Sequence, residues 1–213
     1  MRRAAAAVLV LLLPAACGRA PEEPMPPRFA QVAGQTQLQH GERLATVLGC
    51  NGCHGRNLQG QPWEEDANLA ISFSSNLTRA LPAYSDRLLE RAIRAGVRHD
   101  GSALWSMPSE IFTELDPADL AAVIAYLRTL RPAGVVHPRI VFGPAGRRAV
   151  ADGSYKSTPQ WVVDTRGQAP VRFDSSHDQA RYMTRATCGE CHTVTLTGRR
   201  STEEPRGPPD LNV

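Results

Sequence analysis

The stretch GCNGCHGRN, Gly49 to Asn57, places two cysteines three positions apart and follows the second at once with a histidine. Cys50 and Cys53 can each be alkylated by one vinyl group of a single haem, and His54 is then held close to the iron. The pattern Cys-x-x-Cys-His is therefore typical of a covalent haem attachment site. A redox dithiol or half of a zinc site are the alternatives, but the sequence has neither a βαβ pattern nor further cysteines at zinc-ligand spacing.

The same pattern returns near the other end of the chain, in TCGECHTVT, residues 187–195. The likeness extends beyond the motif, because residues 43–60 align without gaps on residues 181–198. This internal repeat predicts a second domain of the same kind and a second covalently bound haem c. The second motif supplies Cys188, Cys191 and His192, and the matched pairs outside the motifs are Arg43 with Arg181, Thr46 with Thr184, Leu58 with Leu196 and Gly60 with Gly198.

The N-terminus has the composition of an export signal. Two arginines precede an apolar run over residues 4–13, which is too short to span a membrane comfortably. We expect a signal peptide over residues 1–16 and a proline-rich tether over residues 17–36. Cys17 resembles the lipidated cysteine of bacterial lipoproteins, and ordinary signal cleavage is the alternative. The expected location is the periplasmic side of the bacterial envelope, either lipid-anchored at Cys17 or soluble.

Composition limits the remaining possibilities. The chain has 213 residues, of which 42% are hydrophobic, and its 17 glycines and 17 prolines predict long irregular segments. A bound haem can fill the core of such a domain. The net charge of +3 is not gathered into a basic face, so nucleic acid is not an expected partner.

Three helices are predicted between the first motif and residue 132. Residues 40–49 carry an apolar stripe that leads into the motif, and residues 84–96 have Ser85 as N-cap and Gly96 as terminator. Residues 115–132 form the clearest helix, with Asp116 as cap and Pro117 at the first helical position. These helices, with long loops between them, describe a small all-α domain.

Met107 is the predicted sixth ligand of the first iron. It lies in the loop DGSALWSMPSE, residues 100–110, beside a proline and outside any helical stripe. An iron that only carries electrons needs a sixth ligand, since an open position admits small molecules, and a thioether ligand also raises the reduction potential. The alternative is that Met107 fills the core.

Four stretches taken in order, CNGCH, SSNLT, YSDRLLERAIRAGVRHDGSALWSMPS and LDPADLAAVIAYLRTLRP, resemble a class I cytochrome c domain over Gln37 to Pro132. They are most similar to the domains of multihaem cytochromes that serve membrane-linked dehydrogenases. The resemblance implies a fold in which the first and last helices cross, with His54 as proximal and Met107 as distal ligand. It also implies contacts to the haem propionates, for which the candidates are Asn76, Trp63 and Arg98.

The remainder of the chain is predicted to be a linker over residues 133–174 and an incomplete second cytochrome c domain over residues 175–213. The linker is expected to lie on the first domain through residues 140–142, with His137 exposed and a small hairpin of WVVD and PVRF across TRGQ. No methionine or histidine follows His192, which suggests a truncated product. The iron held by His192 is the second metal site, for which His177 or Met183 are alternative ligands.

These features favour a dihaem electron carrier over an enzyme. We expect it to relay single electrons for a dehydrogenase, with another cytochrome or a terminal oxidase as further redox partners. The alternatives are a dihaem peroxidase, a thiosulfate dehydrogenase or a haem-based ligand sensor, each with one open iron site. Four arginines along one helix and its exit, at positions 87, 91, 94 and 98, form either a docking face or a solvated face with local ion pairs.

Overall fold

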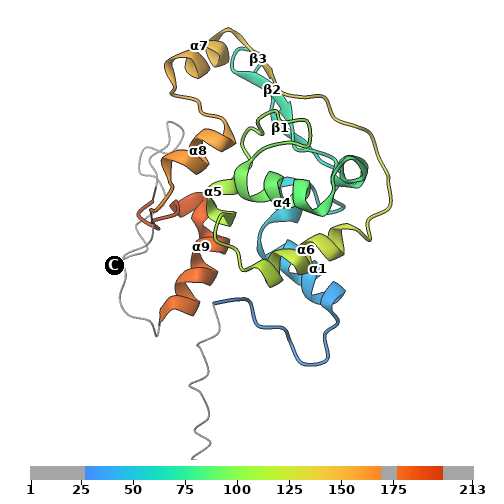
Figure 1. The fold of residues 1–213 in the computed structure, drawn as a ribbon. Coiled ribbons are helices and arrows are strands. Elements are labelled where there is room, and N and C mark those ends of the chain that lie inside the picture. Colours follow the sequence, from blue (N-terminus) through green and yellow to red (C-terminus); the bar gives the residue numbers. More distant parts are fainter. Residues whose placement is uncertain (1–26, 169–176, 199–213) are drawn as a thin grey trace, which may run out of the picture.

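The structure, a computed structural model, describes residues 27–168 and 177–198 (Figure 1). The predicted signal peptide, Cys17 and the PVRF segment lie outside the described residues. No helix within the two described ranges is long and apolar enough to cross a membrane.

The described residues are mainly helical, as the sequence predicts, with three short strands in addition. The strands form one antiparallel sheet in the order β1-β2-β3, in which β2 is central. The helices are α1 (Gln37–Val47), α2 (Cys50–Cys53), α3 (Leu77–Ala80), the 3₁₀ turn η1 (Leu81–Ala83), α4 (Asp86–Ala95), α5 (Ser109–Phe112), α6 (Pro117–Leu127), α7 (Pro144–Asp152), α8 (Thr158–Asp164) and α9 (Asp178–His192), and the strands are β1 (Pro62–Glu64), β2 (Ala70–Phe73) and β3 (Val141–Phe142).

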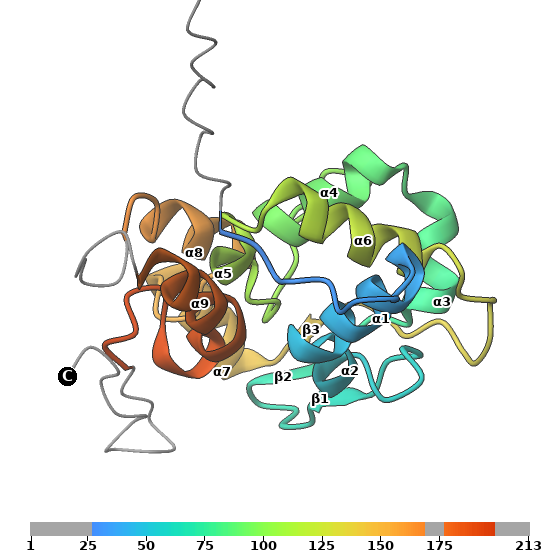
Figure 2. The same cartoon turned by 90° about the horizontal axis from the view of Figure 1, so that it is seen from below.

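The first and last helices of the predicted domain cross, as expected. Helices α1 and α6 have the most extensive contact between any two described elements (Figure 2). Gly41 makes this approach possible, because a Cβ there would lie 1.9 Å from the carbonyl oxygen of Ala122. The crossing buries Leu44 of α1 with Leu120 and Val123 of α6 in one apolar core.

The predicted helix ends are confirmed at α4 and α6. The Ser85 hydroxyl accepts a hydrogen bond from the amide of Leu88, and Gly96 ends α4 in the left-handed conformation, with φ of 66°. The Asp116 carboxylate accepts from the amide of Ala118 at 2.8 Å. These caps satisfy amides that have no partner within their helix.

The segment after residue 132 is more ordered than predicted. Strand β3 pairs with β2, which confirms that residues 141–142 lie on the first domain. The predicted hairpin is wrong, because WVVD is the last part of helix α8. Ser157 and Gln160 form a capping box at the start of α8, and this local signal, with the packing of α8 on α5, outweighs the strand preference of the two valines.

Helix α9, which carries the second motif, packs on the first domain. Tyr182 and Phe29 have ring centroids 5.5 Å apart, and Arg185 forms an ion pair with Glu114. Ala186 and Val194 belong to the same buried apolar cluster as α1 and α6. Both views place α5 beside α8 and α9 (Figures 1 and 2).

Candidate functional site

A cavity of about 430 Å³ lies between the first domain and the segments packed on it, residues 136–140 and Glu190. This volume lies in the range of small-molecule and cofactor sites. Its walls include Cys50, Cys53 and His54 from the first motif and Met107 from the loop before α5. The rest of the wall is largely apolar and includes Leu48, Leu89, Ile93, Phe112, Leu120 and Leu127.

His54 is oriented by a hydrogen bond from its Nδ1 to the carbonyl oxygen of Ser75, at 2.8 Å. A carbonyl oxygen can only accept, so the proton is on Nδ1 and the Nε2 lone pair is free to bind a metal. Burial lowers the pKa of His54, and the bond to Ser75 opposes that shift in part. The imidazole is therefore neutral near pH 7, as a metal ligand must be.

The two thiols of the first motif are presented by a short helix. Gly49 enters the left-handed region, with φ of 78°, and so separates α1 from α2. Burial raises the pKa of Cys50 to about 12 and that of Cys53 to about 11, with the charge of Glu190 adding to the second shift. These thiols are uncharged near neutral pH, so neither has the low pKa of a redox dithiol.

Met107 is held at the edge of the core beside the same cavity. Its backbone carbonyl accepts from the amide of Ser109 at 2.8 Å and from the hydroxyl of Thr158 at 3.0 Å. The residue before it, Ser106, has a left-handed backbone with φ of 63°, which is uncommon for a residue other than glycine. These contacts hold the loop with the methionine beside the cavity.

The three residues proposed for the propionates all line the cavity, but they differ in what they can donate. The amide of Asn76 donates to the carbonyls of residues 133 and 135 at 2.8 Å each, so both of its hydrogens are used. Arg98 is half-buried, and burial lowers its pKa, as does the charge of Arg139. Trp63 is 44% exposed.

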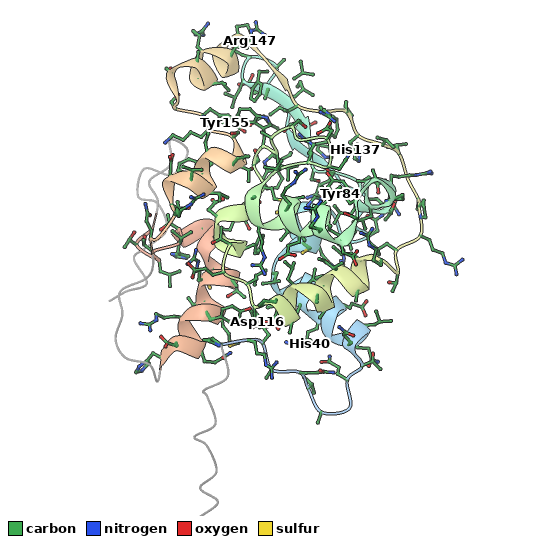
Figure 3. The ribbon with its side chains drawn as sticks, in the orientation of Figure 1. His40, Tyr84, Asp116, His137, Arg147 and Tyr155 are labelled. Carbon is green, nitrogen blue, oxygen red and sulfur yellow. The ribbon has the colours of Figure 1, made fainter. Side chains whose placement is uncertain are left out.

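Sequence reasoning missed several residues that line the cavity. Arg139 belongs to the segment predicted as a linker, yet it lies in the wall with Arg98 and Arg79. His137 is half-buried rather than exposed, because its ring stacks on Phe73 at a centroid distance of 5.0 Å (Figure 3). Its Nε2 also hydrogen-bonds to the carbonyl of Gln59 at 3.1 Å. No sequence pattern marks these residues, because they reach the cavity only through the packing of residues 136–140 on the first domain.

The internal repeat is confirmed by the backbone that follows each motif. Leu58 and Leu196 are both left-handed, with φ of 58° and 61°, which is uncommon for leucine. The amide of Gly60 donates to the carbonyl of His54, and that of Gly198 donates to the carbonyl of His192. The second motif thus has the loop geometry of the first.

The second motif also differs from the first. It ends a continuous helix, α9, and the half-buried Cys188 and exposed Cys191 lie near its C-terminus. The alternative ligands lie earlier on this helix: His177 is its exposed N-cap, and Met183 is 41% exposed. Neither has the sheltered position that Met107 has beside the first cavity.

The two motifs meet. Glu190, between the cysteines of the second motif, lines the first cavity, and its Oε1 accepts from the thiol of Cys53 at 3.7 Å. A thioether at Cys53 would have no such proton, so the relevant feature is the proximity of the two residues. The two motifs, which are 138 positions apart in the sequence, are therefore in contact in the fold.

Three of the four arginines along α4 and its exit form hydrogen bonds or ion pairs within the domain. Arg91 donates to the carbonyls of residues 98 and 99, and Arg98 donates to that of Ala103. Arg94 pairs with Glu90 and donates to three carbonyls around residue 113. Arg87 is exposed. These contacts favour the interpretation as a helix face with local pairs.

Comparison with known proteins agrees with the geometry. The cytochrome c family model matches residues 38–131. The chain is also similar to a protein of Cereibacter sphaeroides described as "Diheme cytochrome c-type", with 26% identity over 219 aligned positions. That alignment covers 91% of this chain and 70% of the relative.

Proposed function

Because the chain is a c-type cytochrome with two haem c attachment motifs, we propose that it relays single electrons between redox proteins of the bacterial envelope, as the acceptor of a dehydrogenase. When bound, each haem c supplies one-electron chemistry through the ferric and ferrous states of its iron. The first haem would be held by thioethers to Cys50 and Cys53. His54 Nε2 and the Met107 sulfur would be its axial ligands.

The observation that carries this proposal is the pairing of His54 and Met107 along one cavity. A histidine with a free Nε2 and a methionine held by its loop would supply two protein ligands to the iron. Two protein ligands leave no open position for a peroxide or a gas, so this site suits a carrier better than an enzyme or a sensor. The apolar wall also excludes water, which favours the less charged ferrous state.

The arginines of the cavity wall support the same assignment. Arg79 and Arg98 each donate to one backbone carbonyl and form no ion pair with a carboxylate within the described residues, whereas Arg139 pairs with Asp100. Arg79 and Arg98 therefore provide the positive charge at this largely apolar cavity. Haem carries two propionate groups, and guanidinium groups are suited to bind carboxylates. The contact between Glu190 and Cys53 supports electron exchange inside one chain, because both haems would be attached at adjacent sites.

The envelope location rests on the sequence. An export signal over residues 1–16 fits the maturation of c-type cytochromes outside the bacterial cytoplasm. Cys17 would attach the protein to the membrane surface by a lipid. The tether predicted over residues 17–36 is too long, because Phe29 is buried in the core and its amide donates to Asp119, so only the residues before it would let the domain reach its partners.

Replacement of Met107 tests the proposal in the full chain, matured in a host with cytochrome c assembly. The oxidised wild type should show the weak near-infrared band of sulfur-ligated ferric haem. Met107→Ala should abolish that band, open the iron to carbon monoxide in the ferrous state and lower its reduction potential, because the thioether favours the ferrous state. Met183→Ala is the matched control and should leave the band in place.

Two outcomes would contradict the proposal. Loss of the band in Met183→Ala, and not in Met107→Ala, would assign the sulfur ligand to the second haem. A wild type without the band that binds carbon monoxide at both irons would indicate open sites, and the enzyme or sensor classes would then replace the relay.

A further inference from the structure

The segment that follows the cytochrome c match contacts the loop of the proposed distal ligand. We define the clasp as residues 141–164, which contain β3, α7 and α8. All of it lies beyond residue 131, where the family match ends. Its first strand is fixed to β2 through the pairs Ala70–Phe142 and Ile71–Val141. Its last helix packs on α5, which begins two residues after Met107.

Thr158 makes the closest contacts between the clasp and the loop. It is 1% exposed, and its hydroxyl donates to the carbonyl of Met107 at 3.0 Å. Its amide donates to the carbonyl of Leu104, also at 3.0 Å. Thr158 is the first residue of α8, where backbone amides have no partner within the helix, so this amide is available to hold another segment. One residue therefore binds the loop at two points.

The end of helix α4 leaves space for the Thr158 side chain. Gly96 ends α4, and a Cβ at that position would lie 2.2 Å from the Thr158 Cγ2 atom. The carbonyl of Gly96 accepts from the amide of Leu104 at 2.7 Å, so Leu104 is held from both sides. The capping box of Ser157 and Gln160, and the ion pair of Lys156 with Asp164, hold the start of α8 in place.

A second set of contacts binds the two residues between Leu104 and Met107. Trp105 packs on Phe142 and Tyr155, with ring centroids 4.8 Å and 5.8 Å away. The Tyr155 hydroxyl, in the turn between α7 and α8, lies 2.9 Å from that of Ser106 (Figure 3). Ser106 is the residue with the left-handed backbone, so the clasp also holds the strained point of the loop.

We propose that the clasp keeps Met107 in its ligating position and that Thr158 is the positioning residue through which it acts. This inference rests on the proposed ligation of the first iron by Met107. It adds that ligation of the iron by the Met107 sulfur depends on residues 141–164, which lie outside the region matched by the cytochrome c family model. A methionine ligand leaves the iron when its loop swings away, and every contact of the clasp with residues 104–107 opposes that motion. Thr158 should therefore control how often the iron opens.

Thr158→Val in the full holoprotein tests the inference, because valine keeps the shape and loses the hydroxyl. The carbonyl of Met107 retains the bond from Ser109, so the fold does not gain an orphaned buried carbonyl. Loss of one hydrogen bond should raise the open fraction of the iron roughly fivefold. We expect carbon monoxide to bind the reduced protein faster by that factor, with a weaker near-infrared band and a lower reduction potential.

Two matched variants separate positioning from general stability. Thr158→Ser retains the hydroxyl and should restore the band and the slow binding of carbon monoxide. Thr165→Val makes the same substitution at the other end of α8, where, among the described residues, the hydroxyl bonds only to the carbonyl of Trp161 in its own helix. It should leave both signals as in the wild type. If Thr158→Val does not accumulate, Tyr155→Phe, which removes the bond to Ser106, should show the same change.

The results distinguish the two proposals. A Thr158→Val protein with the band, potential and binding rate of the wild type would overturn the role of the clasp and leave Met107 as ligand. Equal effects of Thr158→Val and Thr165→Val would also overturn it, since helix stability alone would explain them. A wild type that lacks the Met107-dependent band would instead overturn the ligation itself.

Discussion

Tyr182 should determine how firmly the second motif is held against the first domain. Its hydroxyl donates to the Asp119 carboxylate at 2.6 Å and accepts from the amide of Asp116 at 2.9 Å. Burial raises the pKa of Tyr182, and the hydrogen bond to Asp119 raises it further, so the hydroxyl stays protonated and can donate. Asp119 is 2% exposed and also accepts from the amide of Phe29.

Tyr182→Phe removes both hydrogen bonds and keeps the ring contact with Phe29. A hydrogen bond to a charged group contributes about 1.5–3 kcal/mol, and Asp119 keeps the Phe29 amide as a partner. We therefore expect the docking of α9 to lose about 2 kcal/mol, which is a factor of roughly 30 in the constant for its local opening. The core of α1 and α6 should be unaffected.

Amide hydrogen exchange measures this opening directly. In Tyr182→Phe, the amides in the second half of α9 should exchange roughly 30 times faster, while those of α6 keep their protection. Tyr126→Phe is the control, because the Tyr126 hydroxyl makes no hydrogen bond within the described ranges. Unchanged exchange of α9 in Tyr182→Phe would refute the docking described here, as would an equal effect in Tyr126→Phe.

Haem content, membrane attachment and helix crossing provide three more tests. A haem assay on denatured holoprotein should give two haems per chain, and a value of one would mean that the second motif is not loaded. Cys17→Ser should move the protein to the soluble envelope fraction with an unchanged visible spectrum, whereas unaltered partitioning would favour ordinary signal cleavage. Gly41→Ala should lower the free energy of unfolding by about 3 kcal/mol in denaturant titrations, because its Cβ would lie 1.9 Å from the Ala122 carbonyl oxygen. Helix propensity alone would predict a gain of about 1 kcal/mol, which is the result expected for the control Gly52→Ala, where a Cβ meets no other atom within 4 Å. A Gly41→Ala protein that is stabilised in the same way would contradict the close crossing of α1 and α6.

The parts of the fold that local chemistry determines were predictable. Ser85, Gly96 and Asp116 act at helix ends through contacts within a few residues, and the structure has them where the sequence places them. The repeat was also predictable, because the loop after each motif needs the same backbone, down to left-handed Leu58 and Leu196. Such features depend on short-range geometry and leave a clear trace in the sequence.

The parts that depend on long-range packing were not predictable. Helix α8 is two turns long and contains two β-branched valines, so its periodicity is weak, and contacts with α5 and the Met107 loop stabilise it. Ser75 serves the site through its backbone carbonyl, which no side-chain pattern reveals. Glu190 occupies a position of the second motif where any residue is compatible with haem attachment. Its place beside Cys53 follows only from the docking of α9.

The Met107 loop and the second motif both contact helix α5, and this limits how independently they can move. Helix α5 begins two residues after Met107, and the hydroxyl of Ser109 fixes it to α4 through the carbonyl of Ala92. Helix α5 also contacts α9. A Cβ at Gly189 would lie 2.9 Å from the Ile111 side chain, and the carbonyl of Glu110 accepts a hydrogen bond from Arg185. A displacement of α9 must therefore either move α5 or lose these contacts. Because α5 also packs on α8, the Met107 loop and the helix of the second motif are parts of one packed unit.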